Sequence, residues 1–510
     1  MLKVLNRKSQ EAIESKAMMG VGALTSEEIV EKLASTFCVQ YQRDFRGRSR
    51  MVAFAGPNRT GALTLLVAAT LTEQKHPVEV VLLNPTGTLP DIVVWAKKKL
   101  QANNVPTLEV QTDFHPPVID DKTIVLDGIC GLDQTAPFTG ELAGVTNYIN
   151  AQNGTVVSLE IPSGLLPEDN SKNNLDYVIQ ADYTYTFHGP KLCFFFAENE
   201  DYVGKWKVIN AGLDDGSATP GVEDCYFGED EMSGILHRRP RFSNKYDYGR
   251  TLLIAGSRGM MGAAVLAAKA AYTSGTGHLT VHVPKDTGQI IYTTVPEALV
   301  HEDASESSLS TLPDLGRYDA VAVGPGLGRM AQSRQALSDL LRNYHRPIIL
   351  DADALYHLSE DRSLLNLLPT DSILTPHAGE FDRLFGPCHS GYERFQRAKE
   401  VAMEYKVNIV LKGAYTVICS RTGHAMFNSS GNPGLASAGT GDVLTGVLLA
   451  LLGKEKDSLL ACLAGVYMHG YAADLYRSEY QEESLTASSV IRYLPMAMRA
   501  FLDYGSPMGY

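Results

Sequence analysis

The stretch Gly434-Leu-Ala-Ser-Ala-Gly-Thr-Gly-Asp-Val-Leu-Thr-Gly446 runs from glycine and small residues directly into an apolar segment over residues 440–452. Glycine lets the backbone turn tightly and approach a ligand closely, and the apolar segment predicts a helix. The first N–H groups of a helix have no internal partner, and the helix dipole favours negative charge there. Gly439, Thr440 and Gly441 are therefore predicted to form an anion hole for phosphoryl oxygens.

Asp442 follows in the first turn of this predicted helix. A carboxylate in that place can take a proton from an attacking hydroxyl group. Together with donors for the charge that develops on a phosphoryl group, this is the arrangement that phosphoryl transfer needs. The plainer interpretation is that Asp442 caps a helix after a glycine-rich turn.

Four further polar or glycine-rich loops follow apolar, strand-like runs in the same half of the chain. They are Gly324-Pro-Gly-Leu-Gly328, Asp351-Ala-Asp-Ala-Leu355, Thr375-Pro-His-Ala-Gly-Glu380 and Lys412-Gly-Ala-Tyr-Thr416. In open α/β sheets, ligands bind at the carboxyl ends of the strands. Candidate loops at one edge of a sheet are hard to explain by packing alone, so the context favours the catalytic interpretation of Asp442.

Strand-like runs alternate with helix-like stretches in both halves, which predicts parallel sheets covered on both faces. The pattern lapses between residues 212 and 242, and we expect a domain boundary near residue 225. Residues 1–48 are expected to be largely helical. The expected strands lie at residues 51–56, 78–83, 123–129, 155–161, 251–257, 278–283, 319–328, 347–355, 372–380 and 408–418, and the expected helices at 61–74, 91–103, 140–152, 262–275 and 440–452.

Composition excludes several classes of protein. The 510 residues include 45 Lys and Arg against 58 Asp and Glu, which gives a net charge of −13. Nucleic-acid-binding proteins are usually basic, and an acidic protein is repelled by anionic lipid. Seven scattered cysteines without a C-x-x-C motif predict reduced thiols. The N-terminus has no signal-peptide pattern, and the apolar run near Val443–Leu452 is too short to span a bilayer. We therefore expect a cytoplasmic protein with neither a nucleic-acid nor a membrane partner.

Seven motifs of the second half, taken in order, resemble the ADP/ATP-dependent NAD(P)H-hydrate dehydratases of the ribokinase-like superfamily, over residues 240–500. They are NKYDYG (244–249), GSRGMMGAAVLAAKAA (256–271), GPGLG (324–328), DADAL (351–355), LTPHAGEF (374–381), VLKGAYT (410–416) and NPGLASAGTGDVLTG (432–446). The resemblance implies a ribokinase-like αβα domain over residues 226–510. It also implies a repair reaction on reduced nicotinamide dinucleotides that have added water across the C5–C6 bond of the ring. Such enzymes phosphorylate the C6 hydroxyl at the expense of ADP or ATP; phosphate then leaves, and NADH or NADPH is restored.

The same resemblance assigns roles to individual residues. Asp442 would be the base on the C6 hydroxyl. The nucleotide would lie along Lys412, Gly413, Ala414, Tyr415, Thr416, Gly439, Thr440 and Gly441, and the hydrate would contact Ala264, Gly326, Gly328, His377 and Asp442. His377 and Glu380 also have a plain interpretation, as polar residues of a strand-end loop. Mg²⁺ is expected because phosphoryl transfer needs charge neutralisation. One departure is Ser489, where the family usually has Asp.

Four segments of the first half look like an NAD(P)H-hydrate epimerase domain, over residues 1–212. They are VAFAGPNRTGALTLLVAA (52–69), LDGICG (126–131), SLEIPSG (158–164) and ADYTYTFHGPK (181–191). The resemblance implies a Rossmann-like three-layer αβα domain over residues 1–225. Such a domain interconverts the R and S hydrates, so that an S-specific dehydratase can clear both. The residues that would form its site are Arg59, Thr60, Gly61, Asp127, Gly131, Glu160 and Ser163, with a K⁺ ion held by Thr60, Asp127 and Ser163.

This first half departs from the epimerase pattern at two places. The family's Asn-Asn-Gly-Gly-Asp-Gly loop reads Arg59-Thr-Gly-Ala-Leu-Thr64 here, so Leu63 replaces the acidic residue and Ala62 one glycine. Glu160, one methylene longer, replaces a catalytic Asp. Because a misplacement of about 1 Å can cost ~10²-fold in rate, we predict weak or absent epimerase activity.

Three alternatives stay open. The second half could be a kinase of a vitamin precursor or sugar, since that chemistry uses the same anion hole and carboxylate. The protein could instead be fully bifunctional in hydrate repair, or its first half could be a non-catalytic interaction module. The sequence does not distinguish ADP from ATP, and a homo-oligomer is expected only because the family often forms one.

Overall fold

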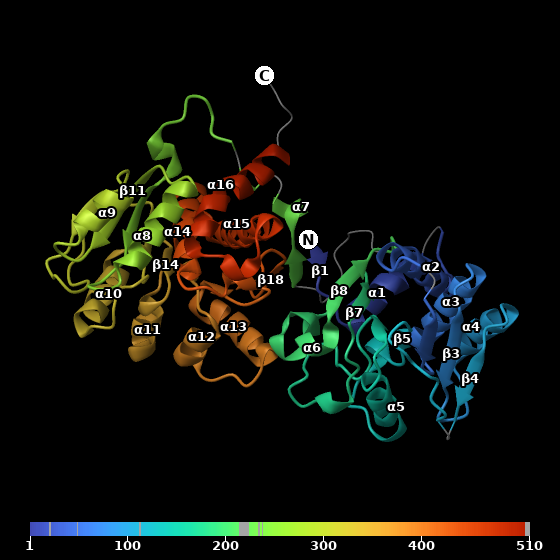
Figure 1. Ribbon diagram of the computed structural model, residues 1–510. Coiled ribbons are helices and arrows are strands. Elements are labelled where there is room, and N and C mark those ends of the chain that lie inside the picture. Colours follow the sequence, from blue (N-terminus) through green and yellow to red (C-terminus); the bar gives the residue numbers. More distant parts are fainter. Residues whose placement is uncertain are drawn as a thin grey trace. The chain divides into compact units, whose positions relative to one another are not determined.

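The computed structural model describes residues 1–19, 22–47, 49–111, 114–213, 224–232, 235–236 and 238–504 (Figure 1). The chain divides into two compact units. The N-terminal unit comprises residues 2–223 and 390–392, and the C-terminal unit comprises residue 1 and residues 224–389 and 393–510.

The N-terminal unit is built on one parallel sheet, with strand order β4-β3-β2-β5-β6-β7-β8. Its strands are β2 (Met51–Ala55), β3 (Val78–Leu83), β4 (Thr107–Val110), β5 (Ile124–Gly128), β6 (Thr155–Leu159), β7 (Tyr183–Phe187) and β8 (Lys205–Ile209), and a short strand β1 (Leu2–Lys3) precedes them. Its helices are α1 (Arg7–Ala17), α2 (Ser26–Asp44), α3 (Arg59–Glu73), α4 (Asp91–Ala102), α5 (Gly140–Asn150) and α6 (Glu200–Val203).

The central strands of this sheet are apolar and buried along their whole length, as expected for parallel strands covered on both faces. Residues of α2, α3 and α4 pack with one face of the strands, and residues of α5 pack with the other, in two separate hydrophobic clusters. The predicted Rossmann-like αβα architecture is confirmed.

The C-terminal unit holds a second, larger sheet with strand order β9-β18-β17-β16-β15-β14-β13-β10-β11-β12. Its strands are β9 (Cys225–Phe227), β10 (Arg250–Ile254), β11 (His278–Val283), β12 (Leu299–Glu302), β13 (Ala320–Val323), β14 (Ile348–Leu350), β15 (Ile373–Leu374), β16 (Asn408–Leu411), β17 (Val417–Cys419) and β18 (Ala425–Asn428). Its helices are α7 (Glu229–Met232), α8 (Met261–Thr273), α9 (Gly288–Thr294), α10 (Ala331–Asn343), α11 (Asp353–Glu360), α12 (Ala378–Phe385), α13 (Gly391–Tyr405), α14 (Thr440–Glu455), α15 (Ser458–Glu479) and α16 (Ala487–Tyr504).

Most neighbouring strands of this sheet are parallel, but β16–β17 and β17–β18 are antiparallel. The expected single strand over residues 408–418 is therefore two strands, separated by the loop Lys412–Thr416. Gly413 and Ala414 are exposed at its tip, and the Thr416 hydroxyl donates to the Gly413 carbonyl over 3.1 Å, which closes the turn.

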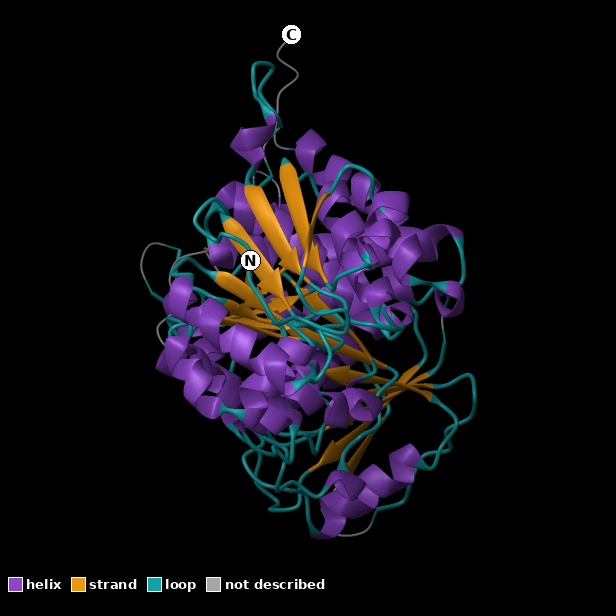
Figure 2. Ribbon diagram, turned by 90° about the vertical axis from the view of Figure 1, so that its left-hand side faces the viewer, coloured by secondary structure: helices purple, strands orange, loops and turns teal. Residues whose placement is uncertain are grey.

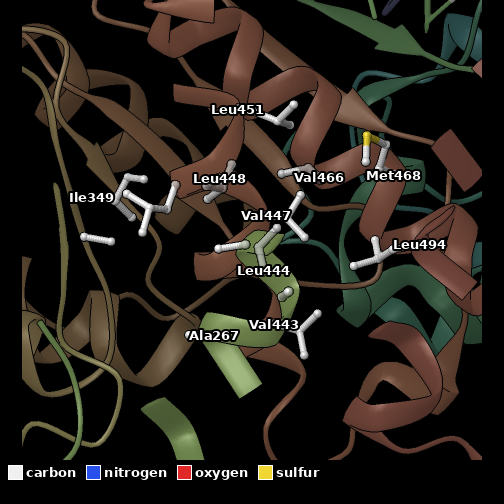
Figure 3. Packing of buried hydrophobic residues seen from close by; sticks show 14 of the residues in the cluster. Ala267, Ile349, Val443, Leu444, Val447, Leu448, Leu451, Val466, Met468 and Leu494 are labelled. Atoms are coloured by element: carbon white, nitrogen blue, oxygen red, sulfur yellow. The ribbon is translucent and has the colours of Figure 1, made fainter. Parts of the chain in front are cut away.

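Helices α8, α14, α15 and α16 share one hydrophobic core with the strands of the C-terminal unit (Figure 3). Figure 2 shows the strands running between groups of helices. Helix α14 is buried on nearly all sides because it lies between the sheet and the other helices. A Cβ atom on Gly446 would lie 2.1 Å from the Ala267 carbonyl oxygen, so only glycine allows α8 to approach α14 this closely.

Two further predictions can be compared with the structure. All seven cysteines are free. In the part of the chain that the structure describes, no helix is long and apolar enough to cross a membrane.

Candidate active site

Helix α14 begins at the glycine-rich stretch that the sequence singled out. Gly439 precedes the first helical residue with a φ angle of +89°, a left-handed conformation that favours glycine. A Cβ atom there would also lie 2.6 Å from the Leu266 Cδ1 atom. The turn leaves the N–H groups of Gly441 and Asp442 at the helix start, where intrahelical partners are lacking and the dipole favours an anion.

The side chains of Thr440 and His469 hold the start of this helix by hydrogen bonds. The Thr440 hydroxyl lies 2.8 Å from the carbonyl oxygens of both Leu435 and Ser437. The buried His469, on α15, donates from Nε2 to the Thr440 carbonyl over 2.9 Å. Burial lowers the pKa of His469 to about 4, so the ring is neutral at pH 7. A neutral imidazole adds no positive charge beneath the anion hole.

The Asp442 carboxylate is largely buried beside the helix start. Burial, and after it the negative charge of Asp351, raises the pKa of Asp442 to about 6, while the Lys412 ammonium opposes the shift. A general base acts best when its pKa lies near the working pH. Asp442 is thus a stronger base than an ordinary aspartate, yet it is still ionised at pH 7.

Lys412 brings a positive charge to the same place. Its Nζ atom lies 3.0 Å from Asp351 Oδ1, 3.7 Å from Glu380 Oε2 and 3.6 Å from the position that a Cβ on Gly441 would take. Burial works against the charged form, but the carboxylates of Asp351 and Glu380 outweigh it and raise the pKa of Lys412. The ammonium is therefore charged and lies beside the predicted anion hole.

Asp353 and His357, on α11, hold the loop that contains Gly326 and Gly328. The Gly328 N–H donates to Asp353 Oδ2 over 2.9 Å, and His357 Nε2 donates to the Gly328 carbonyl over 2.9 Å. Gly326 has a φ of +60°, and a Cβ on it would lie 2.6 Å from the Met260 carbonyl oxygen. Glycine is required here for the close approach to the loop before α8.

His377 and Ala264 occupy different environments. The exposed His377 caps α12, because its Nδ1 atom accepts from the Gly379 N–H over 3.1 Å, and it forms an isolated parallel β-bridge with Lys412. Ala264 is completely buried in α8, and its Cβ atom lies 3.3 Å from the place that a Cβ on Gly256 would take, so its methyl group does not face solvent. The tip of the predicted nucleotide loop, in contrast, is exposed at Gly413 and Ala414.

Ser489 has a structural role. The Thr486 and Ser489 hydroxyl groups are 3.0 Å apart, and the Ser489 N–H donates to the Thr486 hydroxyl over 3.2 Å, which caps the start of α16. The first residue of that helix, Ala487, lies close to Gly439. Serine thus keeps the local capping contact without the negative charge of an aspartate.

The sequence did not assign roles to Asp351, Asp353, Thr445 or His469. The signal for the first two was present, since DADAL follows a strand. Their partners Lys412 and Gly328 come from other strand ends, however, and the pairing becomes visible only once the sheet order is known.

The candidate site of the N-terminal unit also lies at the carboxyl ends of parallel strands. Asp127, completely buried, accepts hydrogen bonds on Oδ2 from the Ser158 hydroxyl (2.7 Å) and the Ser163 N–H (2.8 Å). Burial raises the pKa of Asp127 in spite of these bonds. The Ser163 hydroxyl in turn accepts from the Cys130 N–H over 3.0 Å. The two predicted residues Asp127 and Ser163 therefore lie together in one network.

Glu160 lies in a second buried network, and both of its oxygens have partners. Oε1 accepts from the Gln10 amide over 2.7 Å, and Oε2 lies 3.1 Å from the Thr186 hydroxyl and 3.3 Å from Lys191 Nζ. Burial alone would raise the pKa of Glu160, but the Lys191 ammonium and the Gln10 amide lower it. Gln10 belongs to α1, so this helix covers the carboxylate that the resemblance assigns to catalysis.

Arg59 and Thr60 start α3 beside these networks. Arg59 Nη2 lies 2.8 Å from Glu14 Oε2, again on α1. Thr60 is buried, and a Cβ on Gly131 would lie 2.3 Å from its hydroxyl oxygen, which requires glycine there. Asn58 caps the helix by accepting from the Gly61 N–H over 2.9 Å.

The residues predicted to hold K⁺ do not fit that ion well. A hard cation needs several free oxygen ligands. Asp127 already accepts from the Ser158 hydroxyl and the Ser163 N–H, and burial raises its pKa, which works against the charged form; the Ser163 hydroxyl already accepts from the Cys130 N–H. Leu63, at the place of the family's acidic residue, is buried in the hydrophobic core.

Comparison with known proteins gives matches in both units. A family model described as NAD(P)H-hydrate dehydratase matches residues 251–496, and one described as YjeF-related protein N-terminus matches residues 18–193. The chain is 32% identical over 467 residues to the bifunctional NAD(P)H-hydrate repair enzyme of Thermofilum pendens, covering 88% of this chain and 87% of the relative. It is 31% identical over 376 residues to that of Escherichia coli K12, covering 73% and 70%.

A solved structure is also similar. The ADP/ATP-dependent NAD(P)H-hydrate dehydratase from Bacillus subtilis, co-crystallised with ATP and Mg²⁺, is 34% identical with a TM-score of 0.48, covering 54% of this chain and 98% of that one.

Proposed function

The chain belongs to the family of bifunctional NAD(P)H-hydrate repair enzymes, and we propose that its C-terminal domain, predicted over residues 226–510, restores hydrated NADH and NADPH by nucleotide-dependent dehydration. The observation that carries this proposal is the start of α14. There the free N–H groups, the charged Lys412 and the basic Asp442 meet at one point.

The reaction follows from this arrangement. Asp442 removes the proton of the C6 hydroxyl, whose oxygen attacks the terminal phosphorus of ADP or ATP. The new O–P bond forms as the bond to the leaving AMP or ADP breaks. The α14 N–H groups and Lys412 stabilise the charge on the transferring group. The C6–O bond then breaks with phosphate as the leaving group, assisted by the ring nitrogen lone pair, and loss of the C5 proton restores the C5–C6 double bond.

The remaining site residues position the two substrates. The exposed loop Lys412–Thr416 and residues Gly439–Gly441 take the nucleotide, while the loop with Gly326 and Gly328 and His377 contact the hydrate, with Ala264 beneath it. Their mutual contacts support this assignment, because Lys412 is bridged to His377 in the sheet and Gly328 is held by Asp353.

Mg²⁺ is proposed to arrive with the nucleotide, where it neutralises phosphate charge. The carboxylates of this site suit a Mg²⁺ ion that binds together with the nucleotide better than a Mg²⁺ ion held by the protein alone. Asp351 and Glu380 are engaged by Lys412, and Asp353 by Gly328. Among the described residues, no group of three or more metal-binding side chains is assembled.

The competing function is that of a small-molecule kinase. The product distinguishes the two. Incubation of the protein with the S-hydrate and ADP or ATP should release phosphate and produce the absorbance of the reduced nicotinamide ring. A stable phosphoester without that absorbance would identify a kinase instead.

For the N-terminal domain, predicted over residues 1–225, we propose an epimerase-like fold with weak or no epimerase activity, kept as a scaffold or ligand-binding module. In its support, both oxygens of Glu160 are occupied by Gln10, Thr186 and Lys191, and Leu63 lies in the core. The test is an assay with the isolated R-hydrate. Conversion to the S-hydrate at the rate of active relatives would overturn the proposal and establish full bifunctionality.

Assembly and location are proposed from the family and the composition. We propose a cytoplasmic homo-oligomer that binds hydrates and nucleotides but neither nucleic acid nor membranes, in line with the net charge of −13. Sedimentation of the full-length protein, with and without DNA, tests the assembly and the expected lack of nucleic-acid binding.

A further inference from the structure

Asp351 is a buried acid with partners in two different elements. It follows β14 directly and is only 2% exposed. Its Oδ1 atom lies 3.0 Å from Lys412 Nζ, at the end of β16, and its Oδ2 atom accepts from the Thr445 hydroxyl over 2.7 Å. Thr445 lies three residues after Asp442 on α14. One carboxylate therefore joins the lysine of the nucleotide loop to the helix that carries the proposed base.

The backbone around Asp351 is tightly constrained. The next residue, Ala352, has a φ of +48°, which is left-handed and unfavourable for alanine. A Cβ on Gly324, in the neighbouring strand-end loop, would lie 1.8 Å from the Asp351 carbonyl oxygen. Such strain persists only where the surrounding structure enforces it. The constraint fixes the direction of the Asp351 side chain.

A buried acid with a purely structural role does not need this set of partners. An amide could accept the hydrogen bond from Thr445 equally well. The negative charge acts on Lys412 and Asp442, and it raises the pKa of both. Burying an unpaired carboxylate would be costly, and the Lys412 ammonium offsets that cost.

We propose that Asp351 is a positioning residue for phosphoryl transfer, which holds the Lys412 ammonium against the start of α14 and ties that helix in place through Thr445. The proposal rests on the function proposed above for the C-terminal unit. It assigns to Asp351 no contact with either substrate. Its effect is to keep the positive charge and the base in one geometry while the phosphoryl group passes between them.

The test replaces Asp351 with asparagine in the full-length protein. Asp351→Asn keeps the size and the Thr445 bond but removes the charge that holds Lys412. We expect kcat to fall by about 10- to 100-fold, with less than about a threefold change in the KM of the hydrate, the pattern for an interaction made in the transition state. The acid limb of the kcat profile should move to lower pH, because removing a neighbouring negative charge lowers the pKa of Asp442.

Two other variants complete the design. Thr445→Val removes only the hydrogen bond between α14 and Asp351, so kcat should fall while the acid limb of the pH profile stays in place. Asp319→Asn removes a charge paired with Arg346 next to β13 and serves as the control for charge removal in general. Wild-type kcat in folded Asp351→Asn, or a loss no larger than that of Asp319→Asn with an unmoved acid limb, would overturn the proposal. If Asp351→Asn does not fold, an unchanged kcat in Thr445→Val does the same.

A measurement without substrate separates this proposal from the proposed function. Infrared difference titration of the ligand-free protein follows the Asp442 carboxylate, assigned by comparison with Asp442→Asn. The Asp351→Asn exchange should lower its midpoint whether or not the hydrate is the substrate. An unmoved midpoint contradicts the role of Asp351, whereas a wild type that forms no reduced nicotinamide contradicts the proposed function.

Discussion

At the scale of a single residue, Asp442 combines a place at an anion-binding helix start with raised basicity. It belongs to a helix start with free N–H groups, and burial beside Asp351 makes it more basic than an ordinary aspartate. We predict that Asp442→Asn lowers hydrate dehydration by at least about 10²-fold, the usual scale for loss of a general base, while nucleotide binding is retained. Initial rates and calorimetric titration with ADP measure the two effects. Near-normal kcat would remove Asp442 from the mechanism.

The pH dependence of the reaction reports the same residue. Asp442 acts as a base only when ionised, so activity should be lost as the pH falls through its pKa of about 6. An ordinary aspartate would keep its activity some two pH units lower. A kcat profile from about pH 3 to pH 8 decides between the two midpoints. An acid limb centred near pH 4 would mean that the titrating group is not the buried Asp442.

Lys191 is the partner of the buried Glu160 in the N-terminal unit. Lys191→Met should destabilise the unit by about 3–5 kcal/mol, because it leaves a buried carboxylate without its countercharge. The double variant Lys191→Met with Glu160→Gln is the matched control and should recover part of the loss. Urea unfolding measures both. Equal stabilities of the single and the double variant would show that the pair is not coupled.

At the scale of elements, the packing of α8 against α14 determines where the anion hole lies. Gly446→Ala introduces a Cβ atom 2.1 Å from the Ala267 carbonyl oxygen, so the helices must separate, at a cost of about 1–3 kcal/mol. Gly262→Ala, on α8, is the control, since no atom lies within 4 Å of its new Cβ. Thermal unfolding should show a lower Tm for the first variant only. A Tm equal to the control would mean that the helices tolerate the extra atom.

The elements were largely predictable because their signals are local. The helix after Gly439 follows from glycine geometry and an apolar run, and β2 follows from an uninterrupted apolar segment. The antiparallel strands β17 and β18 were not predicted. Their turn at Lys412–Thr416 looks like any strand-end loop, and its closure by Thr416 is a side-chain contact that no periodicity reveals.

The site was predictable only in part, for a different physical reason. Glycine-rich loops and Asp442 stand out in one stretch of sequence. The Asp351–Lys412–Thr445 contacts join three elements, and the Gln10–Glu160 hydrogen bond joins α1 to the end of β6, 150 residues away. Such pairings depend on the order of strands in the sheet and on how α1 packs, which the sequence pattern does not contain.

At the scale of the whole molecule, we predict an incomplete repair cycle, in which the S hydrate is restored and the R hydrate is not. With an R and S hydrate mixture and excess nucleotide, we predict that the protein alone consumes only the S isomer, because Gln10 and Lys191 engage both oxygens of Glu160. Chromatography of the remaining hydrate should show the R isomer left over, and an added active epimerase should then clear it. Complete consumption without that addition would show that the N-terminal unit is an active epimerase.

The central claim is that the C6 hydroxyl oxygen is phosphorylated before it leaves the ring. The most direct test uses S-hydrate prepared in ¹⁸O-labelled water, so that the label resides in that oxygen. Incubation with nucleotide and mass analysis of the products should find the label in inorganic phosphate. Label in the solvent, with unlabelled phosphate, would contradict phosphoryl transfer at the start of α14.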